Sequence, residues 1–209
     1  MLVAPPHRPT LKEELARLPT RFRYAAIAVL ALLAVAAIFL LAGGATAEDG
    51  TRVAVEEPIA FNLRYPDGME RIDDNALLHL QRPGKDEFTV EPLELPPYTG
   101  DVGGVLPVEA SREVERLKKR FPNLELVEEG KVRINRAAGY SLVFRASRNP
   151  RMYGRLVLLP EPVPGARTGV KLLMLATPAG GAGKARDVGT SGAVKTPYRS
   201  FRFGTETSG

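Results

Sequence analysis

A run of nineteen residues, from Tyr24 to Ala42, contains no charged side chain, no amide and no proline. As an α-helix rising about 1.5 Å per residue, this run would be roughly 28 Å long, close to the ~30 Å thickness of the hydrocarbon core of a bilayer. The sequence therefore predicts a transmembrane helix over residues 24–44. This helix divides the chain into a short N-terminal tail, residues 1–23, and a much larger C-terminal part.

The charges that flank the apolar run are asymmetric. The tail holds five basic residues against two acidic ones, whereas Glu48 and Asp49 follow the run. Lysine and arginine next to a span favour the cytoplasmic side of the membrane. We therefore expect a cytoplasmic tail and an extracytoplasmic C-terminal part. Thr10 and Glu13 match a capping box, which predicts a short amphipathic helix within the tail.

A cleaved signal peptide is the alternative interpretation of the apolar run. Ala45-Thr46-Ala47 matches the small-residue pattern of a cleavage site, and cleavage after Ala47 would release a secreted domain. The apolar core of a signal peptide is usually only about 7–15 residues long, so the length favours an uncleaved anchor. The chain has no cysteine, which excludes a lipid-anchored lipoprotein.

The part of the chain after the span has the patterning of one α+β domain. We expect a stalk over residues 45–58, the domain over 59–204 and a disordered end over 205–209. Alternating apolar residues, as in Phe61, Leu63 and Tyr65, predict half-buried strands. The expected strands cover residues 61–65, 69–72, 76–81, 87–94, 123–128, 131–135, 139–146, 153–159, 169–177 and 199–204, and the expected helix covers 107–121. Short connections favour an antiparallel sheet with one or two packed helices.

Charge is divided unevenly along this domain. Residues 45–130 carry 10 basic and 19 acidic side chains, and residues 131–209 carry 14 basic and 3 acidic ones. One interpretation is a basic surface for an acidic polymer or for anionic headgroups. The other, which we favour, is that the two halves neutralise each other within one sheet. Neither interpretation leads us to expect nucleic-acid binding.

Several segments together resemble the PsbP family. The segments are AFNLRYPDGMERI, GYSLVFRA, RLVLLP, GVKLLMLATP and PYRSFRFG, in that order along residues 56–204. The resemblance implies a curved antiparallel sheet with helices packed on it. The family usually has a helix before its last strand, but residues 179–192 here are glycine-rich, which predicts a mobile loop instead. The family includes photosystem-associated and unrelated binding proteins, so the fold implies no particular activity.

The chain also resembles single-pass envelope proteins of high-GC, actinobacterial-type bacteria. This second resemblance agrees with the anchor and with an extracytoplasmic domain. It implies a place in the cell envelope without implying a reaction.

Residues able to carry catalysis or to bind metals are scarce. The only histidines are His7 and His79, and with no cysteine present we expect no metal site, no cofactor and no catalytic residues. Ala179 to Lys184 resembles a phosphate-binding loop, but Pro178 and Ala185 occupy two of its defining positions.

One basic cluster remains as a possible contact for an anion or a partner. It consists of Arg145, Arg148, Arg151 and Arg155. Guanidinium groups suit phosphate or carboxylate, although a solvated hairpin loop explains the same residues.

The sequence therefore favours a membrane-anchored extracytoplasmic binding or scaffold protein without catalytic activity. Its expected partners are the bilayer, through residues 24–44, and an envelope protein or acidic polymer. The alternatives are an envelope hydrolase that uses carboxylate acid–base chemistry and a secreted domain released after Ala47.

Overall fold

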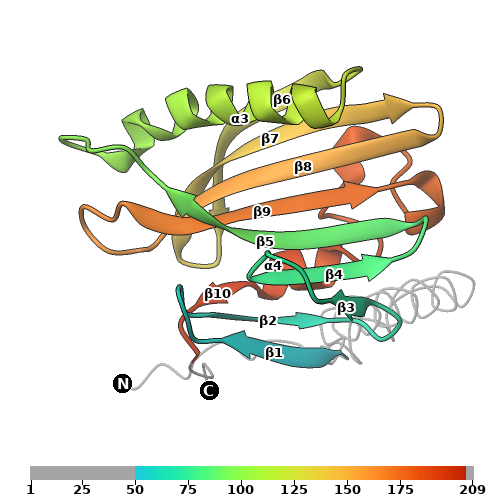
Figure 1. The fold of residues 1–209 in the computed structure, drawn as a ribbon, viewed down its shortest axis with the longest axis horizontal. Coiled ribbons are helices and arrows are strands. Elements are labelled where there is room, and N and C mark those ends of the chain that lie inside the picture. Colours follow the sequence, from blue (N-terminus) through green and yellow to red (C-terminus); the bar gives the residue numbers. More distant parts are fainter. Residues whose placement is uncertain (1–49, 206–209) are drawn as a thin grey trace, which may run out of the picture. The chain divides into compact units, whose positions relative to one another are not determined.

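The computed structural model describes residues 50–205 of the chain (Figure 1). The expected tail, transmembrane helix and residues 206–209 lie outside this range. Within residues 50–205, no helix is both long enough and apolar enough to span a bilayer.

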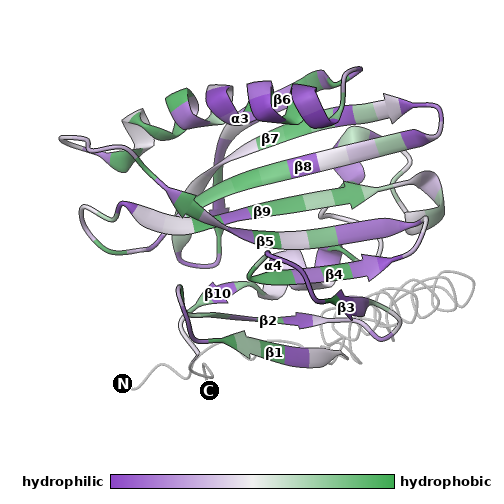
Figure 2. Cartoon of the chain, in the orientation of Figure 1, coloured by the Kyte–Doolittle hydropathy of each residue, from purple (hydrophilic) through white to green (hydrophobic). Residues whose placement is uncertain are grey.

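A seven-stranded antiparallel sheet forms the centre of the fold (Figure 1). Its strands, in spatial order, are β3 (Glu70–Ile72), β4 (Leu78–Arg82), β5 (Asp86–Glu94), β9 (Thr168–Ala176), β8 (Arg151–Pro160), β7 (Ala137–Arg148) and β6 (Glu125–Ile134). The predicted antiparallel α+β fold is thus confirmed for this part of the chain. Figure 2 shows that hydrophobic residues concentrate on β7, β8 and β9. These strands need apolar side chains on both faces because both faces are covered.

A second, three-stranded sheet lies beside the first. It consists of β1 (Thr51–Val55), β2 (Phe61–Tyr65) and β10 (Arg202–Phe203), in the order β1-β2-β10. Phe61 and Leu63 are fully buried, as their alternation in the sequence predicts. The expected stalk over residues 45–58 is wrong in part, because β1 lies inside it and pairs along its whole length with β2.

One face of the large sheet is covered by helix α3 (Leu106–Arg120). Pro107 suits the first turn of the helix, and Lys118 to Arg120 place positive charge at its C-terminal end, where the helix dipole favours it. Leu106, Ala110 and Leu117 of α3 pack against apolar side chains of β7, β8 and β9. The predicted helix is therefore present, shifted by one residue.

The opposite face of the large sheet is covered by the small sheet and by residues 178–200. This C-terminal segment contains two 3-10 turns, Pro178–Gly180 and Ala185–Asp187, and helix α4 (Lys195–Ser200). Its apolar residues join the main core together with Phe88, Val90 and Leu172 of the large sheet.

The glycine-rich segment is packed, which corrects the expectation of a mobile loop. Ala182, Ala185 and Val188 are buried in the core. A Cβ atom at Gly192 would lie 2.1 Å from the carbonyl oxygen of Gly180, so glycine here permits close backbone contact. The expected last strand over 199–204 is also too long, because α4 occupies residues up to Ser200.

Candidate functional site

The four arginines singled out in the sequence lie on the hairpin formed by β7 and β8. Arg145 and Arg148 share one acceptor, since their guanidinium nitrogens lie 2.6 and 3.3 Å from Oε2 of Glu125 on β6. Two positive charges thus meet one carboxylate, which leaves an excess of positive charge at this end of the sheet.

The other two arginines of the hairpin lie apart from that pair. The Cζ atom of Arg155 lies 5.6 Å from the centre of the Tyr198 ring, and the Arg155 guanidinium donates to the carbonyl oxygen of Arg186. Arg155 therefore contacts the C-terminal segment at two points. Arg151 is exposed, and within the described residues it forms no ion pair. The structure therefore brings together Arg145 and Arg148 only, and anion binding by the cluster stays a prediction.

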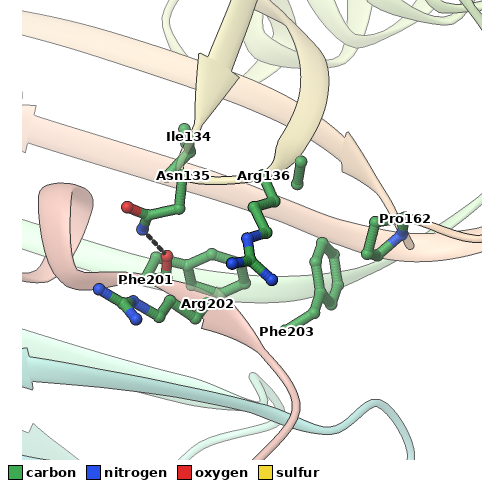
Figure 3. A pocket seen from close by; sticks show the side chains of 8 residues that line it. Ile134, Asn135, Arg136, Pro162, Phe201, Arg202 and Phe203 are labelled. Atoms are coloured by element: carbon green, nitrogen blue, oxygen red, sulfur yellow. Dashed lines mark hydrogen bonds between the residues drawn. The ribbon is translucent and has the colours of Figure 1, made fainter. Parts of the chain in front are cut away.

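A pocket of about 390 Å³ lies at the turn between β6 and β7 (Figure 3). We call it the turn pocket. Three segments that are distant in sequence line it: the turn itself, the loop between β8 and β9, and the chain around β10. The lining residues are Ile134, Asn135, Arg136, Ala137, Pro162, Phe201, Arg202 and Phe203.

Asn135 links two of the segments that line the turn pocket. Its backbone has φ 52°, a conformation that asparagine tolerates better than most residues. Its side-chain nitrogen donates to the carbonyl oxygen of Phe201, at 2.5 Å (Figure 3), and to the carbonyl oxygen of Arg199, at 3.2 Å. These bonds fasten the C-terminal segment to the β6–β7 turn, and Arg136 and Phe203 are thereby placed around one opening. A guanidinium beside an aromatic ring suits an acidic group that carries an apolar portion.

A second hollow, of about 470 Å³, lies beside the C-terminal end of α3. We call it the polar recess. Charged side chains from β4, β5, β9 and α3 converge there, together with the loop before β4. The charged or titratable residues that line it are Asp74, His79, Glu87, Glu91, Arg120 and Lys171.

His79 occupies the centre of the polar recess. Its Nδ1 lies 2.6 Å from Oδ2 of Asp74, and its Nε2 lies 3.5 Å from Oε1 of Glu87. The Nε2 atom is buried and has no hydrogen-bond partner among residues 50–205. Hydrogen bonds from the backbone N–H of Ala76 and from His79 lower the pKa of Asp74 below its usual value.

The histidine and its aspartate resemble two members of a Ser-His-Asp triad, but the third position differs. A nucleophile would have to meet Nε2, but the Glu87 carboxylate lies 3.5 Å from that atom. The hydroxyl of Thr89 donates to the same carboxylate, at 3.3 Å. The recess is therefore arranged as an ion-pair and hydrogen-bond network.

Two buried glutamates of α3 extend this network and were missed in the sequence. Glu109 and Glu113 are only 4% and 5% exposed. Arg112 contacts Glu109, and Lys171 of β9 reaches Glu113 at 3.5 Å and Glu91 at 2.9 Å. Their spacing of four residues on one helix face was a possible signal, but acidic residues at that spacing are usually solvent-exposed.

Comparisons with known proteins support the fold. No protein-family model and no curated protein matches the chain. Among solved structures, cyanobacterial PsbP (CyanoP) from Synechocystis is 15% identical over 77% of this chain and 95% of its own, with a TM-score of 0.50. LpqN of Mycobacterium tuberculosis is 13% identical over 74% of this chain and 91% of its own, with a TM-score of 0.51. The chain therefore has a PsbP-like fold, as its resemblance to that family implied.

Proposed function

We propose that this chain is a single-pass membrane protein that displays a non-catalytic binding or scaffold domain on the extracytoplasmic side of the cell membrane. Residues 24–44 would form the anchor, with the basic tail inside. The similarity in fold to LpqN, which is described as involved in cell envelope biogenesis, supports a place in the envelope.

The geometry around His79 is the observation that carries the non-catalytic part of the proposal. A general base needs its free nitrogen next to a nucleophile or an open substrate position. Here Glu87 lies 3.5 Å from that nitrogen, and the hydroxyl of Thr89 donates to the same Glu87 carboxylate, so this position is taken up by a charged network. The alternative envelope hydrolase would need two carboxyl groups whose pKa values are pushed apart, with one of them raised.

We further propose that the partner is an envelope protein or polymer that offers acidic groups to exposed arginines at the two ends of β7. Within the described part of the chain, Arg136 at the turn pocket and Arg151 on the hairpin carry no ion pair, so both guanidinium groups are available. Forming such contacts costs less when the arginine has no internal partner to give up.

Binding of polyglutamate, used as a probe of acidic polymers, tests this part of the proposal. We expect the full-length protein to bind polyglutamate, and Arg136→Glu or Arg151→Glu to weaken binding at least threefold. Lys119→Glu, on the exposed face of α3, makes the same change in net charge and serves as the matched control. Equal losses in all three variants would mean that only net charge matters, and the proposed contact would be abandoned.

The N-terminus of the mature protein tests anchor against secretion. We expect the intact mass of the membrane-extracted protein to include residues 1–47. A mass that begins at Glu48 would instead support the secreted alternative.

A further inference from the structure

Strand β6 forms one edge of the large sheet. Within residues 50–205 it pairs with β7 only, so the backbone groups on its outer side are open to another strand. Most of its side chains are exposed, including Leu126 at 41% and Val127 at 43%. A ten-residue edge of this kind can accept an added strand from a partner.

The charges on β6 are ordered along the strand. Its first half is acidic, with Glu128 and Glu129, and its second half is basic, with Lys131 and Arg133. Glu128 pairs with Arg186, but Glu129 and Lys131 form no ion pair within the described residues. A strand that is acidic at one end and basic at the other complements an antiparallel copy of itself.

Symmetry restricts how two copies of this edge can pair. A two-fold axis perpendicular to the sheet makes the strands antiparallel and keeps the two faces of the sheet matched. Centred on Gly130, this axis places Glu129 of each copy opposite Lys131 of the other. Centred on Glu129 or on Lys131, it would place like charges opposite each other, which is destabilising.

The bulge in β6 is compatible with this register. The pairing of β6 with β7 shifts between Leu126 and Glu128, so the strand is regular only from Glu128 onward. Centred on Gly130, the regular ladder covers Glu128 to Val132 in both copies. Charged edges and bulges usually discourage strand addition, but here the charges discriminate between partners and favour a second copy of the same chain.

We infer that β6 is a homodimer interface, in which two copies pair edge to edge about Gly130 and form one continuous sheet. The partner is a second copy of this chain, because the edge is complementary in charge to itself. The inference is independent of the proposed binding function, since it needs only the described strand and its charges.

Disulfide cross-linking of the full-length protein in its membrane tests the inference. The natural chain has no cysteine, so one introduced cysteine reports on one position. At Gly130 an added Cβ meets nothing within 4 Å, and facing residues of antiparallel strands have Cα atoms about 4.5–5.5 Å apart, within the range for a disulfide. We expect Gly130→Cys to form a covalent dimer upon oxidation with copper phenanthroline.

Asp67→Cys is the control, because Asp67 is exposed in the turn between β2 and β3, and β3 forms the edge of the large sheet opposite β6. We expect at least tenfold less cross-linking from this position. Equal cross-linking from both cysteines would indicate random collision and would overturn the inference, as would the absence of cross-linking from Gly130→Cys.

Charge reversal then tests the register. In the Gly130→Cys background, Glu129→Lys or Lys131→Glu alone turns two attractive pairs into two repulsive ones, and we expect the yield of covalent dimer to fall about tenfold. The double variant E129K/K131E exchanges the charges and should restore the yield, which also excludes misfolding as the cause of the losses. A double variant that cross-links no better than the single ones would overturn the proposed register.

Discussion

Replacing Gly154 with alanine should destabilise the domain through a single clash. Gly154 of β8 is paired with Phe144 on the neighbouring strand β7. A Cβ atom at Gly154 would lie 2.3 Å from Cζ and 2.4 Å from Cε2 of the Phe144 ring. That ring is fully buried and lies 6.3 Å from the ring of Phe121, so it has little room to move away. Overpacking of this kind costs about 1–3 kcal/mol of the free energy of unfolding.

Urea unfolding of the full-length protein in mild detergent, followed by circular dichroism, measures this cost. Gly130→Ala is the control, since its Cβ meets nothing and the change should be neutral or slightly stabilising. Phe144→Leu alone should cost about 1 kcal/mol. The double variant G154A/F144L should be no less stable than Phe144→Leu, because the smaller side chain vacates the space that the methyl group needs. Simple addition of the two single losses would refute the reasoning.

Three further predictions use the same measurement of unfolding. Asp74→Asn should flatten the loss of stability in acid. The lowered pKa of Asp74 stabilises the folded state above its usual pKa of 3.8, and this contribution is lost as the pH falls through the lower pKa of the folded state, so the stabilities of the wild type and the variant should converge toward acid pH. Unfolding midpoints at about pH 5, 4 and 3 check this, and parallel curves would contradict it. Lys171→Met should lower the free energy of unfolding by about 1–2 kcal/mol. This is less than the cost of breaking a fully buried ion pair, because Glu113 loses Lys171 but keeps Arg116. Adding Glu113→Gln should recover part of the loss. Asn135→Ala should lower the free energy of unfolding by about 1–2 kcal/mol, because two hydrogen bonds are lost and alanine is strained at this positive φ. Asn135→Gly should cost about half as much, because only the hydrogen bonds are lost. Equal losses in the two variants would show that backbone strain contributes nothing.

Local patterns in the sequence predicted most of the strands and the long helix. Alternation correctly placed Phe61 and Leu63 on a buried face. The apolar runs in β8 and β9 are nearly continuous because both faces of the large sheet are covered, one by α3 and the other by the small sheet and residues 178–200. These features were predictable because each depends on how apolar residues repeat within a single helix or strand.

Features that depend on contacts between distant segments were not predictable in this way. Glu109 and Glu113 are buried because Lys171 and the arginines of α3 neutralise them, and Lys171 comes from a strand far along the chain. The glycine-rich segment is ordered because its glycines permit close backbone contact, which local helix propensity does not register.

The candidate site shows the same division. The hairpin arginines were visible in the sequence as a basic cluster, but the sequence did not reveal that Arg145 and Arg148 share Glu125 or that Arg155 packs on Tyr198. The turn pocket was missed because its walls come from three segments that meet only in the folded chain.

Labelling of single cysteines in intact cells tests the central claim most directly. In the cysteine-free chain, Val163→Cys provides an exposed thiol on the domain. We predict that a membrane-impermeant maleimide labels this thiol in intact cells, and that a cysteine placed at position 9 in the tail is labelled only after the membrane is opened. Labelling of the tail cysteine in intact cells while the Val163→Cys thiol stays protected would contradict the account.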